Sequence, residues 1–270
     1  MDARPSVLVR GVGDVGSAVA SVLFRAGWGV ALHDTPAPAT TRRGMAFADA
    51  VFDGAATLDG LTARRVGTAA ALRRSLRDRA ALPVAVWPLA DLLAASGWAA
   101  LVDARMRKRA VPEPQRGLAP LTLGLGPNFV AGGTVDLAVE TGWGEALGAV
   151  VAHGPTRALA GEPRAIGGAG RERFVYAPVA GRFATGARIG EPVAAGSVLA
   201  WIGATALAAP LAGVIRGLVR DGVMVTEGAK VIEVDPRGDP ALAFGIGERP
   251  RRIAEGVLAA LATHAAAPAR

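Results

Sequence analysis

Short apolar runs alternate with segments of helical periodicity through the first half of the chain. The valine-rich run at 6–10 predicts a strand, and the apolar spacing of 17–26 predicts a helix that stops at Gly27. The same patterns recur further along: strands are expected at 29–33, 82–87 and 100–103, and helices at 42–51, 69–80 and 89–96. This alternation is typical of a mostly parallel sheet, so the pattern predicts an α/β fold.

The second half carries an internal repeat. The motif Ala-Pro-x-Ala-Gly occurs at 177–181 and 209–213, and the motif Gly-x-x-Val-x-x-Gly occurs at 190–196 and 222–228. The two copies are 32 residues apart, and two equivalent strand-and-turn halves are expected to interlock into a flattened, all-β barrel. The predicted organisation is a Rossmann-like cofactor- or nucleotide-binding domain over 1–168, a barrel over 169–240, and a segment over 241–270 whose helix at 252–264 packs back on the first domain.

A glycine-rich loop follows the first predicted strand and opens the first helix. Its glycines, Gly11, Gly13 and Gly16, flank Asp14 in the pattern G-x-G-x-x-G, and Asp34 ends the next strand. In this context Gly11 permits the tight turn, Gly13 lets a phosphate approach the backbone, and Gly16 allows helix and strand to pack closely. Asp34 is placed to accept a hydrogen bond from a ribose hydroxyl. The alternative is that the glycines serve only helix–strand packing and Asp34 only a turn.

Three further segments supply candidate ligands for a phosphate-bearing cofactor. In a parallel sheet these segments emerge at the same edge as the first glycine loop. A ligand is therefore expected between that loop and a second glycine-rich loop at 124–129. Each segment also has an interpretation without a ligand: a solvated helix start at 42–43, a charged surface loop at 103–109 and an ordinary turn at 124–129. The candidate residues are Arg42 and Arg43 after the second strand; Asp103, Arg105, Lys108 and Arg109 after the strand at 100–103; and Gly124, Gly126 and Asn128 in a glycine-rich loop after the apolar run at 121–125.

Composition narrows the possible chemistry. Among 270 residues, 30 are Lys or Arg and 23 are Asp or Glu, giving a net charge of +7, but the basic residues are scattered among acids, which argues against a nucleic-acid binder. The absence of cysteine excludes disulfides and any catalytic or sulfur-carrying thiol. Only three histidines occur, and none are paired at ligand spacing, so no metal site is expected.

Two uncharged runs, at 118–135 and 198–215, reach the length of a membrane span. Both contain Gly and Pro, which favours short strands and turns over a spanning helix. Charged residues also interrupt the first apolar stretch, so no signal peptide is expected. The sequence therefore predicts a cytoplasmic protein without membrane contact.

The repeat resembles the biotinyl/lipoyl-like domains, in which both motifs mark each half. In carriers of that family, a lysine lies at the hairpin between the halves. The corresponding segment here, at 201–208, contains no lysine. The resemblance therefore implies a barrel-sandwich fold that carries neither biotin nor lipoate and serves as a structural or docking module.

The chain as a whole resembles the YqeB-type accessory proteins of selenium-dependent molybdenum hydroxylase systems, which are related in role to the XdhC/CoxI maturation factors. The motifs that carry the resemblance are RGxGD at 10–14, RR at 42–43, LVDARM at 101–106, LGLGPxF at 123–129 and DPRGD at 235–239. The resemblance implies a non-catalytic protein that binds the molybdopterin-type cofactor and helps to process or insert it.

The partners implied are a client molybdenum hydroxylase, xanthine dehydrogenase-like, and an enzyme that donates sulfur or selenium, because this chain has no thiol of its own. Two other functions remain open at this point. One is an NAD(P)-linked oxidoreductase that binds a dinucleotide at the glycine loop, and the other is a scaffold that binds no cofactor.

Overall fold

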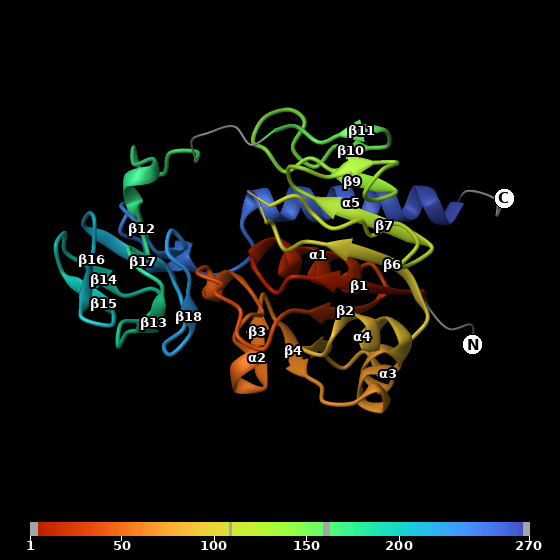
Figure 1. Ribbon diagram of the computed structural model, residues 1–270, viewed down its shortest axis with the longest axis horizontal. Helices are drawn as coiled ribbons and strands as arrows, with labels where there is room; N and C mark the ends of the chain where they lie inside the picture. The colour runs from red at the N-terminus through yellow and green to blue at the C-terminus, as the bar shows by residue number, and fades with distance from the viewer. Residues whose placement is uncertain (1–4, 108–109, 159–162, 267–270) are drawn as a thin grey trace.

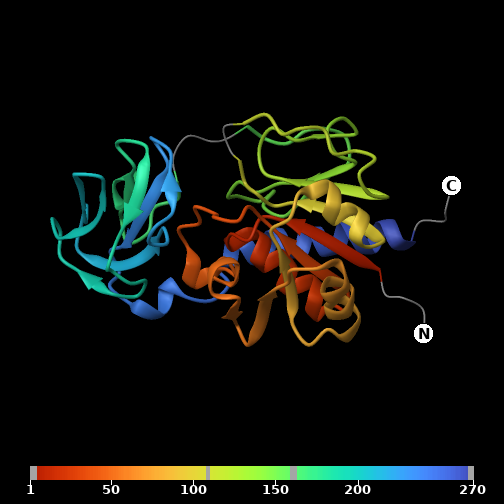
Figure 2. The same ribbon diagram turned by 60° about the horizontal axis from the view of Figure 1, so that its bottom comes forward.

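A computed structural model describes residues 5–107, 110–158 and 163–266. The chain forms a nine-stranded sheet with helices on both faces and, to one side of it, two four-stranded antiparallel sheets (Figures 1 and 2). We call the first part the α/β module and the two antiparallel sheets the β-module. The large sheet is mostly parallel, as the alternating pattern predicts.

The order of the strands reverses at the centre of the large sheet. From β1 the chain passes to β2 and then to β3 at the edge of the sheet, comes back inward through β4 and β5, and crosses to the other side of β1 for β6, β7 and β9. Such a reversal leaves a crevice at the carboxyl ends of the central strands, where ligands bind in open α/β sheets. In spatial order the strands are β10 (Val150–Val151), β9 (Leu137–Val139), β7 (Leu121–Leu125), β6 (Trp98–Asp103), β1 (Ser6–Arg10), β2 (Gly29–His33), β5 (Leu82–Ala85), β4 (Leu61–Arg65) and β3 (Ala55–Leu58).

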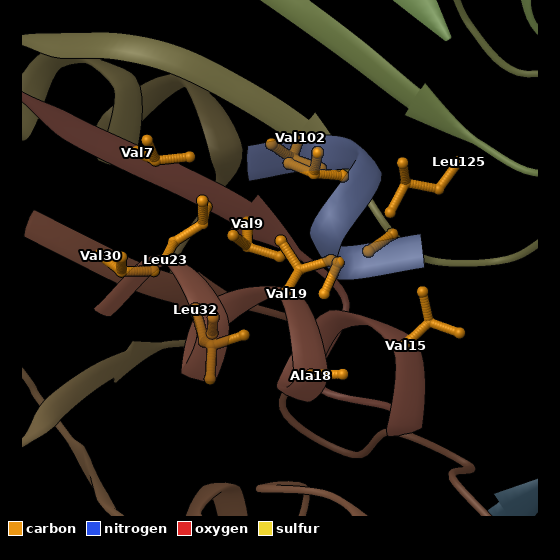
Figure 3. Close-up of a cluster of buried hydrophobic side chains, with 14 of the residues drawn as sticks. Val7, Val9, Val15, Ala18, Val19, Leu23, Val30, Leu32, Val102 and Leu125 are labelled. Carbon is orange, nitrogen blue, oxygen red and sulfur yellow. The ribbon is translucent and has the colours of Figure 1, made fainter. Parts of the chain in front are cut away.

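Successive side chains of the central strands face opposite helical layers. Val7 and Val9 of β1 pack towards α1 (Asp14–Arg25) and α5 (Glu248–Ala266), as Figure 3 shows for α1. Leu8, between them, packs towards α3 (Ala69–Asp78) and α4 (Leu89–Ala95). Because both faces are covered, the middle positions of these strands are apolar on both sides. Helix α5 joins the core of the α/β module through Ile253, Val257 and Leu261, although it follows the β-module in sequence.

The β-module reproduces the 32-residue repeat in space. Strands related by the repeat, such as β15 (Val198–Ile202) and β19 (Lys230–Asp235), lie in opposite sheets. Their inward side chains, including Ile202 and Val234, share one core. The first sheet has the order β12 (Phe174–Tyr176), β19, β17 (Gly213–Leu218), β14 (Pro192–Val193), and the second has the order β16 (Thr205–Ala208), β15, β13 (Gly181–Ala184), β18 (Met224–Val225).

The helix predicted over 42–51 is wrong. The structure has only a 3₁₀ turn at Arg43–Met45 and a short helix, α2 (Ala50–Asp53). A side chain at Gly44 would lie 2.7 Å from the carbonyl oxygen of Ala243, so this segment is shaped by tertiary contacts. The antiparallel β3–β4 hairpin was not predicted from the sequence.

Smaller elements complete the chain. They are the paired strands β8 (Val130–Ala131) and β11 (Gly154–Pro155), and the 3₁₀ turns Arg171–Arg173 and Pro240–Ala243. Within the described ranges, no helix has the length and apolar character needed to cross a membrane.

Candidate functional site

The segments singled out in the sequence lie together at the carboxyl edge of the sheet. A side chain at Gly11 would lie 2.8 Å from the carbonyl oxygen of Ala104, which follows β6. A side chain at Gly126, which follows β7, would lie 3.6 Å from Met106. The segment after β6 therefore separates the two glycine loops and contacts both.

The three glycines of the first loop have different roles. Gly11 has φ +109°, and a Cβ on Gly16 would lie 1.9 Å from the carbonyl oxygen of Gly11, so both positions require glycine for the backbone to close. Gly13 has φ −67°, and a Cβ there would meet no atom within 4 Å. Only Gly13 leaves open space beside the loop.

Part of the loop's hydrogen-bonding capacity is used internally. The backbone N–H of Val12 donates to Oδ2 of Asp34 at 2.8 Å, and that of Val15 donates to Oδ1 of Asp14 at 3.0 Å. The backbone N–H groups of Gly13 and Asp14 have no hydrogen-bond partner within the part of the chain that the structure describes. Helix α1 thus begins with free donors, which favour an anion.

Asp34 stabilises the glycine loop by accepting a backbone hydrogen bond from it. Besides the bond from Val12, its Oδ1 accepts the N–H of Thr35 at 2.8 Å. Each carboxylate oxygen can accept a further bond, so a hydroxyl ligand is compatible with this geometry. The predicted position at the end of β2, beside the loop, is the observed one.

Arg42 connects the glycine loop to the β-module. Its Nη1 donates to Oδ2 of Asp14 at 3.1 Å, while Nε and Nη2 donate to the two carboxylate oxygens of Glu233 at 2.9 and 3.0 Å. Glu233 is fully buried. Burial alone would raise the pKa of Glu233, but Arg42 and Lys230 hold it well below its usual range, so this carboxylate is ionised.

Further cations surround the same carboxylates. Lys230 Nζ lies 3.1 Å from Glu233, and Nε of the buried Arg173 donates to it at 3.4 Å. Arg249, at the start of α5, donates from Nε to the carbonyl oxygen of Thr141 at 2.7 Å. Several basic side chains therefore face the glycine loop from both modules.

Arg43 points elsewhere. Its Nη1 pairs with Asp49 at 2.8 Å, and its Nε donates to the carbonyl oxygen of Leu218 at 2.9 Å. This side chain ties the α/β module to the β-module and is not directed at the loop.

A second charged cluster covers the end of β6. The carboxylate of Asp103 accepts Nε of Arg105 at 3.0 Å, and Nη2 of Arg105 also reaches Glu113 at 2.6 Å. Arg10 of β1 donates to Glu113 and Gln115. Arg105 is thus engaged by carboxylates, and the predicted Lys108 and Arg109 lie outside the described residues.

The second glycine loop is shaped by packing. Gly124, predicted in the loop, lies within strand β7, and a Cβ on it would lie 2.3 Å from the ring of Phe129; Asn128, in the loop, adopts φ +73°. The Asn128 side-chain amide donates to the carbonyl oxygen of Ala110 at 3.1 Å. Within the described residues, no group of His, Cys, Asp or Glu could hold a metal ion.

Sequence reasoning missed the ionic residues that the β-module contributes. A signal for them exists in the repeat, where Lys230 and Glu233 replace Val198 and Trp201 of the first copy. Charged residues in one copy of an otherwise apolar strand mark the copy that faces the α/β module.

Fold and site define a two-module protein with a glycine loop at the switch point of an α/β sheet. The chain is 38% identical over 255 residues, 94% of its length, to the "Uncharacterized protein YqeB" of Escherichia coli (strain K12). It spans about half of that relative, 47% of its length. No protein-family profile matches the chain. No solved structure matches it either.

Proposed function

We propose that this chain binds a phosphate-bearing cofactor at the first glycine loop and acts as an accessory protein of molybdenum hydroxylases. The cofactor is of the molybdopterin type, and the protein carries or inserts it without turning over a substrate. The observation that carries the proposal is the open position at Gly13, with the free N–H groups of Gly13 and Asp14 at the start of α1.

The fold supports this proposal. The reversal of strand order at β1 is the one used by Rossmann-like domains, which bind nucleotides and related cofactors at that point. Gly11 and Gly16 shape the loop as the fingerprint requires, and Asp34 stands at the expected strand end. These features suit a ligand whose phosphate contacts backbone donors and whose polar ring lies towards the Gly124–Asn128 loop.

The β-module supports a non-catalytic role. Its two sheets and 32-residue repeat suit a biotinyl/lipoyl-like barrel-sandwich, but the hairpin between β15 and β16 turns at Gly203 and Ala204 and contains no lysine. In our proposal the module is a rigid unit that closes over the cofactor site and docks on a partner. It carries no biotin or lipoate.

The biological setting that we propose comes from the sequence motifs that resemble the accessory proteins of molybdenum hydroxylase systems, such as those at 10–14 and 101–106. The client is a molybdenum hydroxylase, and any sulfur or selenium atom comes from a separate donor enzyme because this chain has no cysteine. The cofactor would be held by this protein during that step.

The proposal is tested by cofactor binding to Gly13→Val. The probe is the molybdenum cofactor released from a purified hydroxylase, with NADH in parallel, measured by equilibrium dialysis. A valine at Gly13 fills the open space, and binding is expected to weaken at least tenfold, equivalent to about 1.4 kcal/mol.

Gly97→Val is the matched control, because Gly97 also has nothing within 4 Å but precedes β6 at the opposite edge of the sheet. Equal binding by the parent and both variants would show that the ligand is not at this loop. Binding of NADH in preference to the molybdenum cofactor would favour the dinucleotide alternative.

A further inference from the structure

The junction between the two modules holds more positive than negative charge. Around the carboxylates of Asp14 and Glu233 lie four basic side chains, which leaves an excess of two positive charges. The four are Arg42, Arg173, Lys230 and Arg249.

These groups are withdrawn from water. The side chain of Arg173 is 3% exposed, and those of Arg42 and Lys230 are 22% and 30% exposed. Burial lowers the pKa of Lys230, and burial with the neighbouring Arg42 lowers that of Arg249 despite the attraction of Asp14. Cations in such a setting cost free energy unless an anion compensates them.

The imbalance continues along β17 and β19. Arg216 and Arg237 share the single carboxylate of Asp235, at 3.6 and 2.6 Å. Nε of Arg216 is buried and has no hydrogen-bond partner within the described part of the chain. The protein's own carboxylates therefore leave this junction undercompensated.

We infer that the junction binds a dianionic phosphate group, such as a phosphomonoester or pyrophosphate, held by both modules at once. The inference rests on the proposed function, because it takes the ligand of the glycine loop to carry phosphate. Lys230 of the β-module and Arg249 of α5 bind the phosphate oxygens, opposite the N–H groups at the start of α1. Arg42, already bound to Asp14 and Glu233, fixes the position of the β-module relative to the glycine loop.

This arrangement assigns the β-module a direct part in binding. In the repeat, Lys230 corresponds to Val198, which is 53% exposed on the opposite sheet. Strand β19, which is joined to the glycine loop through Arg42, carries Lys230 and Glu233, whereas the equivalent strand β15 of the other copy carries no charged residue. A ligand with one negative charge would leave part of the excess uncompensated, so a dianion is the class that fits.

The experiment is calorimetric titration of the full chain with inorganic pyrophosphate. Lys230→Met and Arg249→Met each remove one charge-assisted hydrogen bond, and each is expected to weaken binding roughly 10- to 150-fold. Lys230→Arg is expected to stay within about fivefold of the parent. The exposed Arg188 of the same module provides the control, and Arg188→Met should bind like the parent.

A second readout separates this role from a structural one. Without an anion, Lys230→Met removes one of the cations paired with the buried Glu233, so its midpoint of thermal unfolding should lie below that of the parent. With saturating pyrophosphate the difference between the two midpoints should widen, because only the parent gains the full binding energy, whereas a merely structural role would leave the difference unchanged.

Pyrophosphate binding by Lys230→Met and Arg249→Met equal to that of the parent would overturn the inference. If Gly13→Val alone then lost binding, the glycine loop and the proposed function would stand without the β-module. If no variant lost binding, both would fail.

Discussion

Arg42 and Glu233, 191 residues apart in the sequence, form a two-pronged ion pair with N–O distances of 2.9 and 3.0 Å. Arg42 belongs to the segment after β2, and Glu233 belongs to β19 of the β-module. The same guanidinium holds Asp14 of the glycine loop. The position of the β-module is thereby tied to the loop that we propose as the ligand site.

Arg42→Met should be strongly destabilising, because it leaves the fully buried Glu233 without its main partner. We expect a loss of about 3–5 kcal/mol in the free energy of unfolding, measured by urea denaturation. Arg77→Met is the control, because the Arg77–Asp78 pair is exposed on α3 and should cost about 0.5 kcal/mol or less. Similar losses in the two variants would contradict the importance of the Arg42–Glu233 pair.

Stability should fall in acid because of Glu233. Burial opposes its ionisation, but Arg42 and Lys230 depress its folded-state pKa well below the unfolded value of about 4.3. The unfolded chain therefore binds more protons as the pH drops below that value, and stability present above it is lost. Urea denaturation at pH 6, 4 and 3 should show this loss in the parent and a shallower one in Glu233→Gln. Parallel pH profiles would exclude Glu233 as a source of the acid sensitivity.

The glycines of the first loop should respond differently to alanine. Gly16→Ala places a methyl group 1.9 Å from the carbonyl oxygen of Gly11, so it should cost at least about 3 kcal/mol or prevent folding. Gly13→Ala meets no atom and should cost about 1 kcal/mol or less, as expected at a helix N-cap. Thermal and urea unfolding of the two variants measure the contrast, and a Gly13→Ala variant as unstable as Gly16→Ala would show that Gly13 serves packing.

The β-module should remain unmodified in the presence of ligases for biotin and lipoate. The turn at Gly203 and Ala204 offers no amine, and the nearby β15 and β16 contain no lysine. After coexpression with both ligases, the intact mass should equal the mass of the polypeptide alone. A biotinyl or lipoyl increment would contradict this interpretation of the module.

Local pattern predicted most of the regular elements. The apolar run at 6–10, the glycine loop and the helix after it each depend on near neighbours, and β1 and α1 lie where these signals indicate. The repeat likewise predicted paired strands, since its glycines and valines fix turns and core positions. The helix expected over 42–51 failed because Arg42 and Arg43 are held by Glu233 and Leu218, contacts that no local pattern contains.

The candidate site was predicted only on the side of the α/β module. The spacing of the glycines and the predicted strand ends was enough to place four residues beside one another: Gly11, Gly13, Gly16 and Asp34. Lys230 belongs to a strand more than 200 residues from the loop, and only the packing of the two modules brings it near Asp14. Differences between the two copies of the repeat were the one sequence signal for its role.

Native mass spectrometry of the chain freshly purified from its host tests the central claim most directly. We expect a noncovalent, phosphate-bearing pterin on the parent and its loss from Gly13→Val, while Gly97→Val keeps it. A parent that carries no ligand, or a Gly13→Val variant that carries the same ligand in the same amount, would contradict a cofactor site at the first glycine loop.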